Sequence, residues 1–341
     1  MYESQYFQLK EEVTPEVLQL LTKTTLGTNG AMYQHLDIEH RIFEADNPLF
    51  LTLERNKKAL GNITFCRRNA FWYIRYFAFD TLYQASNKKG IKRNKNSVFK
   101  KELELFFEAA LNENSDKKIE NFYAYIDPRN TRSRWMSEQF GFQKIAQLKT
   151  QSFSRLYPKN QRVEVVNDWY KVKDLIHKNY KEHLFYFEAH ATKPPYYVIY
   201  DNHSELIAVA KVTIVNWKIT RLPGKFGGTL TKLIPYIPFI KRLIKPEKHT
   251  FLVPEMVCSK NNVPQLVEEL FEGILALHKL NVMLWWMDEK DPLYNALSQK
   301  VKWGLLDKIV GSPKVDVVVR NGLNKHEPIQ QPVFVAAFDM V

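Results

Sequence analysis

The sequence contains few cysteines, and it has neither a long apolar segment nor a leader-like start. Its two cysteines, Cys66 and Cys258, lie far apart in apolar, strand-like runs. A disulfide framework is therefore excluded, and we expect both thiols to be reduced core residues. Residues 1–5 lack a basic start and no apolar stretch of signal-peptide length follows them. No window of about 18 uninterrupted apolar residues occurs either. These features predict a soluble, cytoplasmic protein.

The short motifs of several large enzyme classes are also missing. The chain has no His-Glu-x-x-His, no paired Cys-x-x-Cys, no phosphate-binding Walker loop and no Gly-x-Ser-x-Gly. Metal-dependent, phosphoryl-transfer and serine-hydrolase chemistry therefore lack support, and we expect no metal site. His177, His183 and His190 are close in sequence but are not four residues apart, so we interpret them as surface or packing histidines.

The composition is that of a folded protein large enough for two domains. Apolar residues make up 45% of the 341 residues and aromatic residues 13%, which is ample for two hydrophobic cores. We predict one domain over residues 1–157 and a second over residues 158–341, with a linker at 158–161. The net charge of +12, from 49 basic and 37 acidic residues, favours an anionic cofactor, a nucleic acid or a membrane surface as a partner.

The first half is predicted to hold helices around a strand meander. Thr14, Pro15 and Glu16 supply an N-cap, a first-turn proline and an early acidic residue for a helix over 13–26. Short apolar runs separated by polar turns then indicate an antiparallel meander. The predicted elements that follow are helices over 33–43 and 98–111, strands over 49–53, 60–65 and 71–79, and a closing strand over 146–156.

The most specific pattern of the chain begins with the apolar run 122–126, which Asp127 and Pro128 close. This run predicts a buried strand followed by a polar turn. A helix over 131–140 then follows and ends at a glycine, the usual residue type after a helix end. Counted from an asparagine, a small residue stands three positions later, a serine seven, and Gly-Phe eleven and twelve. These residues are Asn130, Ser133, Ser137, Gly141 and Phe142.

This unit resembles the second half of the acetyl-coenzyme A-binding core of the GNAT superfamily of acyltransferases. In that family the asparagine bonds the pantetheine arm of the cofactor, so the resemblance implies that Asn130 and Ser133 bind it. The position seven residues on usually holds a tyrosine that protonates the departing thiolate, and here it holds Ser137. Without the resemblance, Asn130 is an ordinary turn or N-cap residue and Gly141 an ordinary helix stop.

Two tyrosines of the preceding strand are candidates for the missing acid. Tyr123 and Tyr125 lie just before the turn, and we expect one of them to face the cofactor cleft. The alternative is that both are packing residues with bonded hydroxyls. The candidate catalytic residues are therefore Tyr123, Tyr125 and Ser137.

The resemblance also places the pyrophosphate of the cofactor in the loop after the strand over 71–79. The family holds it there with the backbone amides of a glycine-rich loop, and only Gly90 clearly matches. Seven basic residues between Lys88 and Lys101 offer positive charge instead, although such a run is as typical of a solvated loop. The implied cofactor-binding residues here are Phe77, Ala78, Phe79, Lys89, Gly90, Ile91 and Lys92.

The second half repeats the order of elements without repeating the sequence. An apolar run over 282–287, closed by Asp291 and Pro292, parallels the unit of the first half. It has no asparagine in register with Asn130 and no glycine for a phosphate loop, so it is either a scaffold or the acceptor site. The other predicted elements are helices over 168–187 and 264–278 and strands over 196–200, 206–217, 250–258, 316–320 and 332–338.

The second half also carries a basic, amphipathic insertion at 218–248. Leucines and isoleucines alternate there with lysines, and Pro235 and Pro238 break any single helix. Such a segment fits peripheral contact with an anionic membrane surface, a cover for an acyl chain, or a lid over the edge of its own domain.

The fold that the resemblance implies is α/β (α+β): two tandem GNAT-like folds, each a mixed, mostly antiparallel sheet flanked by helices. The implied activity is that of an N-acyltransferase, which transfers an acyl group from acetyl-CoA or another acyl-CoA to the amine of a small molecule or peptide. Two alternatives stay open. One is a non-catalytic ligand-binding protein, and the other is a relative of aminoacyl-tRNA-dependent peptidyl transferases, for which no nucleic-acid motif is present.

Overall fold

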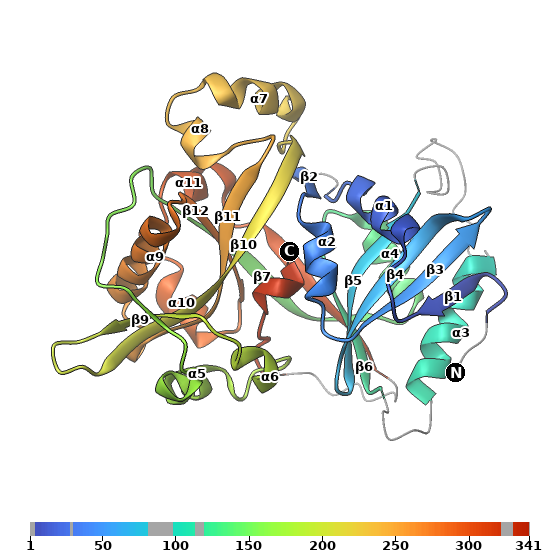
Figure 1. Ribbon diagram of the computed structural model, residues 1–341, viewed down its shortest axis with the longest axis horizontal. Helices are drawn as coiled ribbons and strands as arrows, with labels where there is room; N and C mark the ends of the chain where they lie inside the picture. The colour runs from blue at the N-terminus through green and yellow to red at the C-terminus, as the bar shows by residue number, and fades with distance from the viewer. Residues whose placement is uncertain (1–3, 28–29, 81–97, 113–118, 322–329, 341) are drawn as a thin grey trace.

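The structure is a computed structural model that describes residues 4–27, 30–80, 98–112, 119–321 and 330–340. In its first lobe two strands and two helices precede the predicted meander, and the remaining elements follow in the expected order (Figure 1). The elements of this lobe are β1 (Phe7–Lys10), α1 (Pro15–Lys23), β2 (Met32–His35), α2 (Ile38–Phe43), β3 (Pro48–Arg55), β4 (Lys58–Arg68), β5 (Phe71–Phe79), α3 (Val98–Asn112), β6 (Asn121–Ile126), α4 (Thr131–Gln139) and β7 (Gln143–Ser154).

The second lobe has more short helices than the sequence predicts. Its strands are β8 (Glu164–Val166), β9 (Tyr196–Tyr200), β10 (Leu206–Arg221), β11 (His249–Ser259), β12 (Val282–Asp288) and β13 (Lys314–Asn321). Its helices are η1 (Trp169–Lys171), α5 (Lys173–Tyr180), α6 (Glu188–Ala191), α7 (Gly227–Leu233), η2 (Ile234–Tyr236), α8 (Ile240–Leu243), η3 (Lys260–Asn262), α9 (Pro264–His278), α10 (Pro292–Leu297), α11 (Leu305–Val310) and η4 (Ala337–Met340).

All these strands belong to one 13-stranded sheet that runs through both lobes (Figure 1). The order is β1-β3-β4-β5-β6-β13-β7-β12-β11-β10-β9-β8, with β2 paired to β10. Neighbours are antiparallel except for β5–β6 and β11–β12, which are parallel. The predicted fold class, a mixed and mostly antiparallel sheet flanked by helices in two lobes, is therefore confirmed.

The two lobes exchange one strand each. β13, from the second half, pairs with β6 and inserts between it and β7, and β7 in turn pairs with β12 of the second lobe. Each lobe therefore completes its part of the common sheet with a strand from the other half of the chain. A domain boundary at residue 157 stays a prediction, and these shared strands make the two halves depend on each other.

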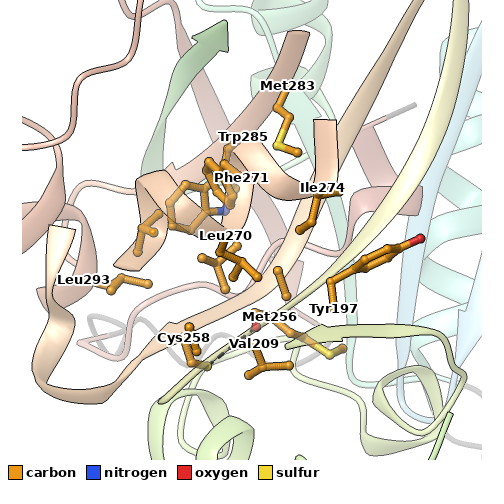
Figure 2. Packing of buried hydrophobic residues seen from close by; sticks show 14 of the residues in the cluster. Tyr197, Val209, Met256, Cys258, Leu270, Phe271, Ile274, Met283, Trp285 and Leu293 are labelled. Atoms are coloured by element: carbon orange, nitrogen blue, oxygen red, sulfur yellow. Dashed lines mark hydrogen bonds between the residues drawn. The ribbon is translucent and has the colours of Figure 1, made fainter. Parts of the chain in front are cut away.

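Helices cover both faces of the sheet. Phe106 and Phe107 of α3 pack against Phe65 and Phe122 of the sheet in one core cluster, as the helical spacing predicts. In the second lobe, α9 buries a cluster that includes Leu270, Phe271 and Ile274 against Trp285 of β12 (Figure 2). Buried apolar area of this kind is the main stabilising contribution to such a fold.

The predicted turn chemistry is present at the start of α1 and at the end of α4. Thr14 caps α1 by accepting the backbone N–H of Val17 through its hydroxyl at 3.4 Å. Gly141 follows α4 with a φ of +74°, a left-handed conformation that favours glycine. The N–H of Phe142 then reaches the carbonyl of Ser137 at 2.9 Å, which closes the helix end.

Three predicted elements are wrong in detail. Residues 33–35 form a strand, because β2 pairs with β10 of the other lobe, and only the second part of the predicted helix over 33–43 is helical. The predicted helix over 168–187 is divided into η1 and α5 and ends at Tyr180. Residues 332–338 do not form a strand: apart from a bridge between Leu184 and Val333 they run as an irregular segment into η4.

Both cysteines are buried free thiols, as predicted. Within the described ranges, none of the helices has the length and apolar character needed to cross a bilayer.

Candidate functional site

The parallel strands β5 and β6 diverge in the first lobe. The two parallel strands pair only over Phe71–Tyr73 and Asn121–Tyr123. Beyond these residues β5 continues to Phe79 and β6 continues to Ile126, but the two strands no longer pair with each other. The place where two central strands diverge is a common place for a ligand in such sheets.

A β-bulge in β5 lies at the start of this divergence. In the ladder with β4, Ile74 pairs with Phe65 and Tyr76 pairs with Thr64, so Arg75 is the extra residue. A bulge interrupts the ladder, turns side chains in a new direction and is frequent beside active sites. The backbone of β5 is therefore irregular at the point where β5 and β6 separate.

The end of β5 carries three of the predicted cofactor-binding residues. Phe77 is 40% exposed and Ala78 is buried. The ring of Phe79 lies over Gly61, where any Cβ would come within 2.4 Å of it. These residues lie on the part of β5 that has diverged from β6, and their role stays a prediction. The predicted phosphate-contacting residues Lys89, Gly90, Ile91 and Lys92 lie outside the described residues.

The turn after β6 and the start of α4 follow directly on the diverging end of β6. The side-chain oxygen of Asn130 accepts the backbone N–H of Ser133 at 3.0 Å, so Asn130 is the N-cap of α4. The amide oxygen of Asn130 is therefore used in the cap, while its NH₂ group is not part of this cap. Ser137 lies one turn further along and donates its hydroxyl to the carbonyl of Arg134 at 2.8 Å.

The two candidate tyrosines of β6 lie on the same face of the sheet, as residues two apart on a strand do. The expectation that only one faces the cleft side is therefore wrong. The Tyr123 hydroxyl accepts a hydrogen bond from Arg68 at 2.9 Å and lies 3.3 Å from a carboxylate oxygen of Asp339. The buried Tyr125 hydroxyl has no hydrogen-bond partner among the described residues. Burial, followed by the charge of Asp339, raises the pKa of Tyr125 well above its usual value, so the hydroxyl keeps its proton.

A group of aromatic side chains from β2 and β10 lies beside Tyr76 of β5. The sequence analysis did not predict this group. Tyr33 stacks on Trp217 with ring centroids 3.8 Å apart, and His35 meets the edge of Trp217 at 5.9 Å. His35 also lies 6.3 Å from the ring of Tyr76, the residue after the bulge. The pairing of β2 with β10 brings a strand of the first half onto the second lobe and positions these rings.

His35 is a buried, neutral hydrogen-bonding group. Burial, with the charges of Arg75 and Arg41 adding to it, lowers the pKa of His35 to about 3. Its Nδ1 atom is buried without a hydrogen-bond partner among the described residues, as is the indole Nε1 of Trp217. Buried polar atoms are normally satisfied, so such orphaned groups mark a place where a ligand or water completes the hydrogen bonds.

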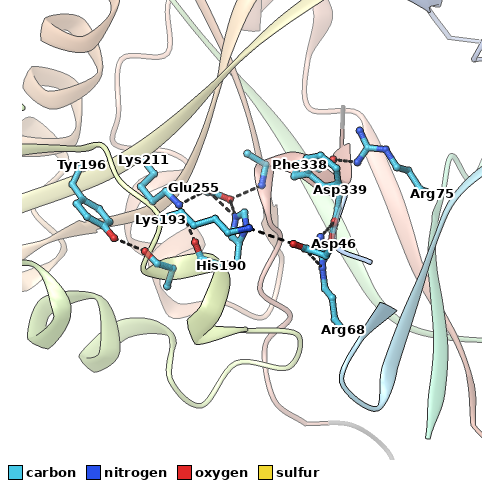
Figure 3. A network of polar contacts seen from close by, with 12 residues as sticks. Asp46, Arg68, Arg75, His190, Lys193, Tyr196, Lys211, Glu255, Phe338 and Asp339 are labelled. Carbon is cyan, nitrogen blue, oxygen red and sulfur yellow. Dashed lines mark hydrogen bonds and ion pairs between the residues drawn. The ribbon is translucent and has the colours of Figure 1, made fainter. Parts of the chain in front are cut away.

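The segment 333–340 joins the two lobes at this point (Figure 3). Two guanidinium nitrogens of Arg68 lie 2.8 Å from the two carboxylate oxygens of Asp339, and Tyr73 donates its hydroxyl to the carbonyl of Asp339. The guanidinium of Arg75 lies over the ring of Phe338, 3.8 Å from its centroid, and donates to its carbonyl. The bulge of β5 is therefore held by the chain's own carboxy-terminal segment.

The second lobe has a corresponding divergence between β11 and β12, which pair only at Leu252 and Met283. It also has a bulge, because Met256 and Val257 together oppose Ala210 of β10, and Met256 has a φ of +53°. A small cavity lies here. Its lining includes Tyr180, Glu255, Trp286, Asp288, Asp291 and Val333–Val335.

Glu255 forms the polar centre of this second cleft (Figure 3). Its carboxylate lies 3.0 Å from the Nε2 atom of His190 and 3.4 Å from the ammonium of Lys211, and it accepts the N–H of Ala337 at 2.7 Å. Burial alone raises the pKa of Glu255, but His190 and Lys211 outweigh this and hold the pKa well below its usual value. The sequence signal was a glutamate inside an apolar strand, since a buried charge requires partners.

His183 also pairs with a carboxylate, because its Nε2 atom lies 3.2 Å from Asp291. Two of the three histidines interpreted from sequence as surface or packing residues therefore belong to buried polar networks. Asp291 is in addition the N-cap of α10, so the turn after β12 corresponds to the turn after β6.

The comparisons with known proteins agree with this two-lobe geometry. The sequence matches no protein-family model and no curated protein. Saccharomyces cerevisiae N-myristoyltransferase with bound myristoyl-CoA aligns with a TM-score of 0.58 at 8% identity, covering 98% of this chain and 90% of that chain. A second structure of that enzyme with myristoyl-CoA gives 0.58 at 9% identity, covering 98% and 86%. A GCN5-related N-acetyltransferase from Sphaerobacter thermophilus aligns with a TM-score of 0.49 at 8% identity, covering 98% and 99%.

At 8–9% identity these likenesses show the fold alone, and that fold is consistent with the predicted GNAT-like architecture. The chain has the two-lobe arrangement of the N-myristoyltransferase structures, which extends over nearly all of its length.

Proposed function

We propose that the protein is an acyl-CoA-dependent N-acyltransferase whose cofactor binds at the divergence of β5 and β6. The observation that carries the proposal is the parallel pair that separates after Tyr73 and Tyr123, with a bulge at Arg75 at the point of separation. The similarity of the fold to N-myristoyltransferase with bound myristoyl-CoA supports the class of cofactor.

The residues around the divergence of β5 and β6 fit such a cofactor. The pantetheine arm lies along the end of β5, at Phe77, Ala78 and Phe79, and receives a hydrogen bond from the NH₂ group of Asn130. Ser133 leaves room for it because its side chain is small. We expect the phosphates to take their countercharge from the basic residues predicted from the sequence, among them Lys89 and Lys92, which lie outside the described residues. The orphaned hydroxyl of Tyr125 and the orphaned Nδ1 of His35 provide hydrogen-bonding capacity that the protein itself leaves unused.

The reaction that follows is direct aminolysis of the thioester. The amine nitrogen forms a bond to the carbonyl carbon, the carbon–sulfur bond breaks, the nitrogen releases one proton, and the sulfur leaves as a thiolate that takes up a proton. The Tyr125 hydroxyl keeps its proton over the physiological pH range and is the candidate donor to the sulfur. Ser137, one helical turn from Ser133, is the second candidate at the position that the family usually gives to a tyrosine.

His35 is the candidate group for orienting the acceptor amine. Because its pKa lies near 3, the imidazole is neutral and accepts a hydrogen bond through Nδ1. It is a weak base at this pKa, so its contribution is orientation rather than storage of the proton, which passes to water. A primary amine of a small molecule or a peptide fits this role.

The test is an acyl-transfer assay on the full chain with acetyl-, octanoyl- and myristoyl-CoA and a panel of small amines and peptides. Release of free thiol together with the mass of the acylated amine supports the proposal, and the preferred acyl chain length follows from the relative rates. Asn295, an exposed residue just after the corresponding turn of the second lobe, provides the matched control. Asn130→Ala should reduce transfer and Asn295→Ala should leave it unchanged. If the protein is folded but transfers no acyl group from any of the three acyl-CoAs, the proposal is contradicted.

A further inference from the structure

The segment between β10 and β11, here called the projection (residues 222–248), extends away from the body of the second lobe (Figure 1). Its inner side is anchored. Gly227, Thr231 and Ile234 are buried at a spacing of four and three residues, and Leu243 is buried as well. The Thr231 hydroxyl donates to the carbonyl of Gly227 at 2.7 Å and accepts the N–H of Leu222 at 3.0 Å. The projection is therefore a folded part of the molecule.

The outer side of the projection exposes large apolar side chains. Phe226, Leu230 and Leu233 follow one another at four and three residues, which places them on one face of α7. They are 81%, 42% and 50% exposed, respectively. The next turn adds Tyr236, Ile237 and Phe239, at 81%, 37% and 56%. A contiguous exposed patch of this kind marks an interaction surface.

Phe239 is held outward by an unusual turn. The N–H of Ile240 bonds to the carbonyl of Pro238 at 2.8 Å, and Phe239 between them has φ 67° and ψ −50°. These angles are those of a strained three-residue γ-turn, which a bulky side chain rarely adopts. Strain of this type persists where the surroundings require it, and here its result is an aromatic ring in solvent.

The projection also carries a large share of the protein's excess positive charge. Residues 222–248 contain six basic residues and one acidic residue, a net charge of +5 out of the total of +12. Lys218 pairs with Glu247. Lys225, Lys232, Lys241 and Lys245 are exposed and form no ion pair within the part of the chain that the structure describes.

This combination decides among the possible occupants. A lid over its own domain accounts for the buried residues Gly227, Thr231 and Ile234 but not for the outer apolar face. A nucleic acid accounts for the lysines but gains little from exposed leucine and isoleucine side chains. A bilayer with anionic headgroups satisfies both, because aromatic and aliphatic side chains enter the headgroup and acyl boundary while lysines contact the phosphates.

We propose that the projection docks the protein on an anionic lipid bilayer, with Phe226, Leu230, Leu233 and Phe239 inserted at the interface and the surrounding lysines bound to headgroups. This inference stands on the projection alone and does not depend on acyl transfer.

Sedimentation of the full chain with lipid vesicles tests it. Binding should be strong to phosphatidylcholine vesicles that contain phosphatidylserine, weak to pure phosphatidylcholine, and reduced by salt. Each lysine near such a surface contributes a factor of roughly five, so Lys232→Gln with Lys241→Gln should weaken binding about 25-fold. Lys57→Gln with Lys58→Gln, on the exposed β3–β4 turn, removes the same charge elsewhere and should change it little.

Phe239 provides the test of insertion. The native chain already has seven tryptophans, so the readout is the emission of Phe239→Trp minus that of the native chain, which should shift to the blue on addition of anionic vesicles. Phe239→Gly relieves the γ-turn, so the variant should stay folded while its vesicle binding weakens. Equal losses from the two lysine pairs, an unshifted tryptophan, or binding to a DNA duplex without binding to vesicles would each overturn the proposal.

Discussion

The buried ion pair of Arg68 and Asp339 should be essential for holding the segment 333–340 between the lobes. The two side chains are 4% and 1% exposed, and two guanidinium nitrogens lie 2.8 Å from the carboxylate oxygens. Removing one partner of such a pair leaves an uncompensated buried charge, which typically costs about 3–5 kcal/mol of unfolding free energy.

Asp339→Ala and Arg68→Ala should differ in how much unfolding free energy they cost. Asp339→Ala leaves Arg68 paired with Asp46 at 2.9 Å, so its cost should lie at the lower end, near 3 kcal/mol. Arg68→Ala leaves Asp46, Asp339 and the Tyr123 hydroxyl without their shared donor, so its cost should be nearer 5 kcal/mol.

Urea unfolding of both variants and of the double variant checks this reasoning. Arg68→Ala combined with Asp339→Ala leaves neither charge of the pair, so the double variant should be more stable than the sum of the two single losses predicts. Hydrogen exchange of residues 333–340 should rise in Asp339→Ala. A loss below about 1 kcal/mol in Asp339→Ala, or strictly additive losses in the double variant, would refute the role of the pair.

Three further predictions follow from the site and the fold. Burial lowers the pKa of His35 to about 3 and that of His249 to about 4, so the unfolded chain binds more protons below pH 6.5. Unfolding free energy should therefore fall as the pH drops from 6.5, by roughly 2 kcal/mol per histidine at pH 5, and each histidine-to-glutamine change should flatten this profile in pH-dependent urea titrations. A fragment of residues 1–157 lacks β13 and β12 as partners of β6 and β7, so its circular dichroism should show no cooperative unfolding; a sharp transition contradicts the exchanged strands. Tyr125→Phe should lower the rate of acyl transfer about 100-fold at unchanged stability, whereas Tyr123→Phe should mainly lower stability, and the reverse result would reassign the acid.

The local elements that the sequence predicts correctly are those determined by neighbouring residues. The run before Asp127, the N-cap at Asn130 and the left-handed Gly141 fix a strand, a turn and a helix end through contacts within about a dozen residues. The fold class was predicted from the resemblance to the GNAT superfamily that these residues carry.

The features that the sequence does not predict depend on contacts far along the chain. β7 and β13 are both antiparallel partners in the centre of the sheet, and nothing in their residues specifies that they cross between lobes. The pairing of β2 with β10 buries His35 beside Trp217, so its lowered pKa is a property of the assembled lobes. Glu255 was visible as a charge in an apolar strand, but its partner His190 lies 65 residues away.

Titration calorimetry of acyl-CoA into the full chain tests the central proposal most directly. The account predicts one site per chain, because only the first lobe has Asn130 at the end of its diverging strands, whereas Glu255 and residues 333–335 line the opening of the second lobe. Asn130→Ala should weaken the affinity about 5- to 150-fold, the equivalent of about 1–3 kcal/mol for a hydrogen bond to the cofactor, while Asn295→Ala should leave it unchanged. Absence of binding at millimolar acyl-CoA, or an unchanged affinity of Asn130→Ala with lowered folding stability, would contradict the account.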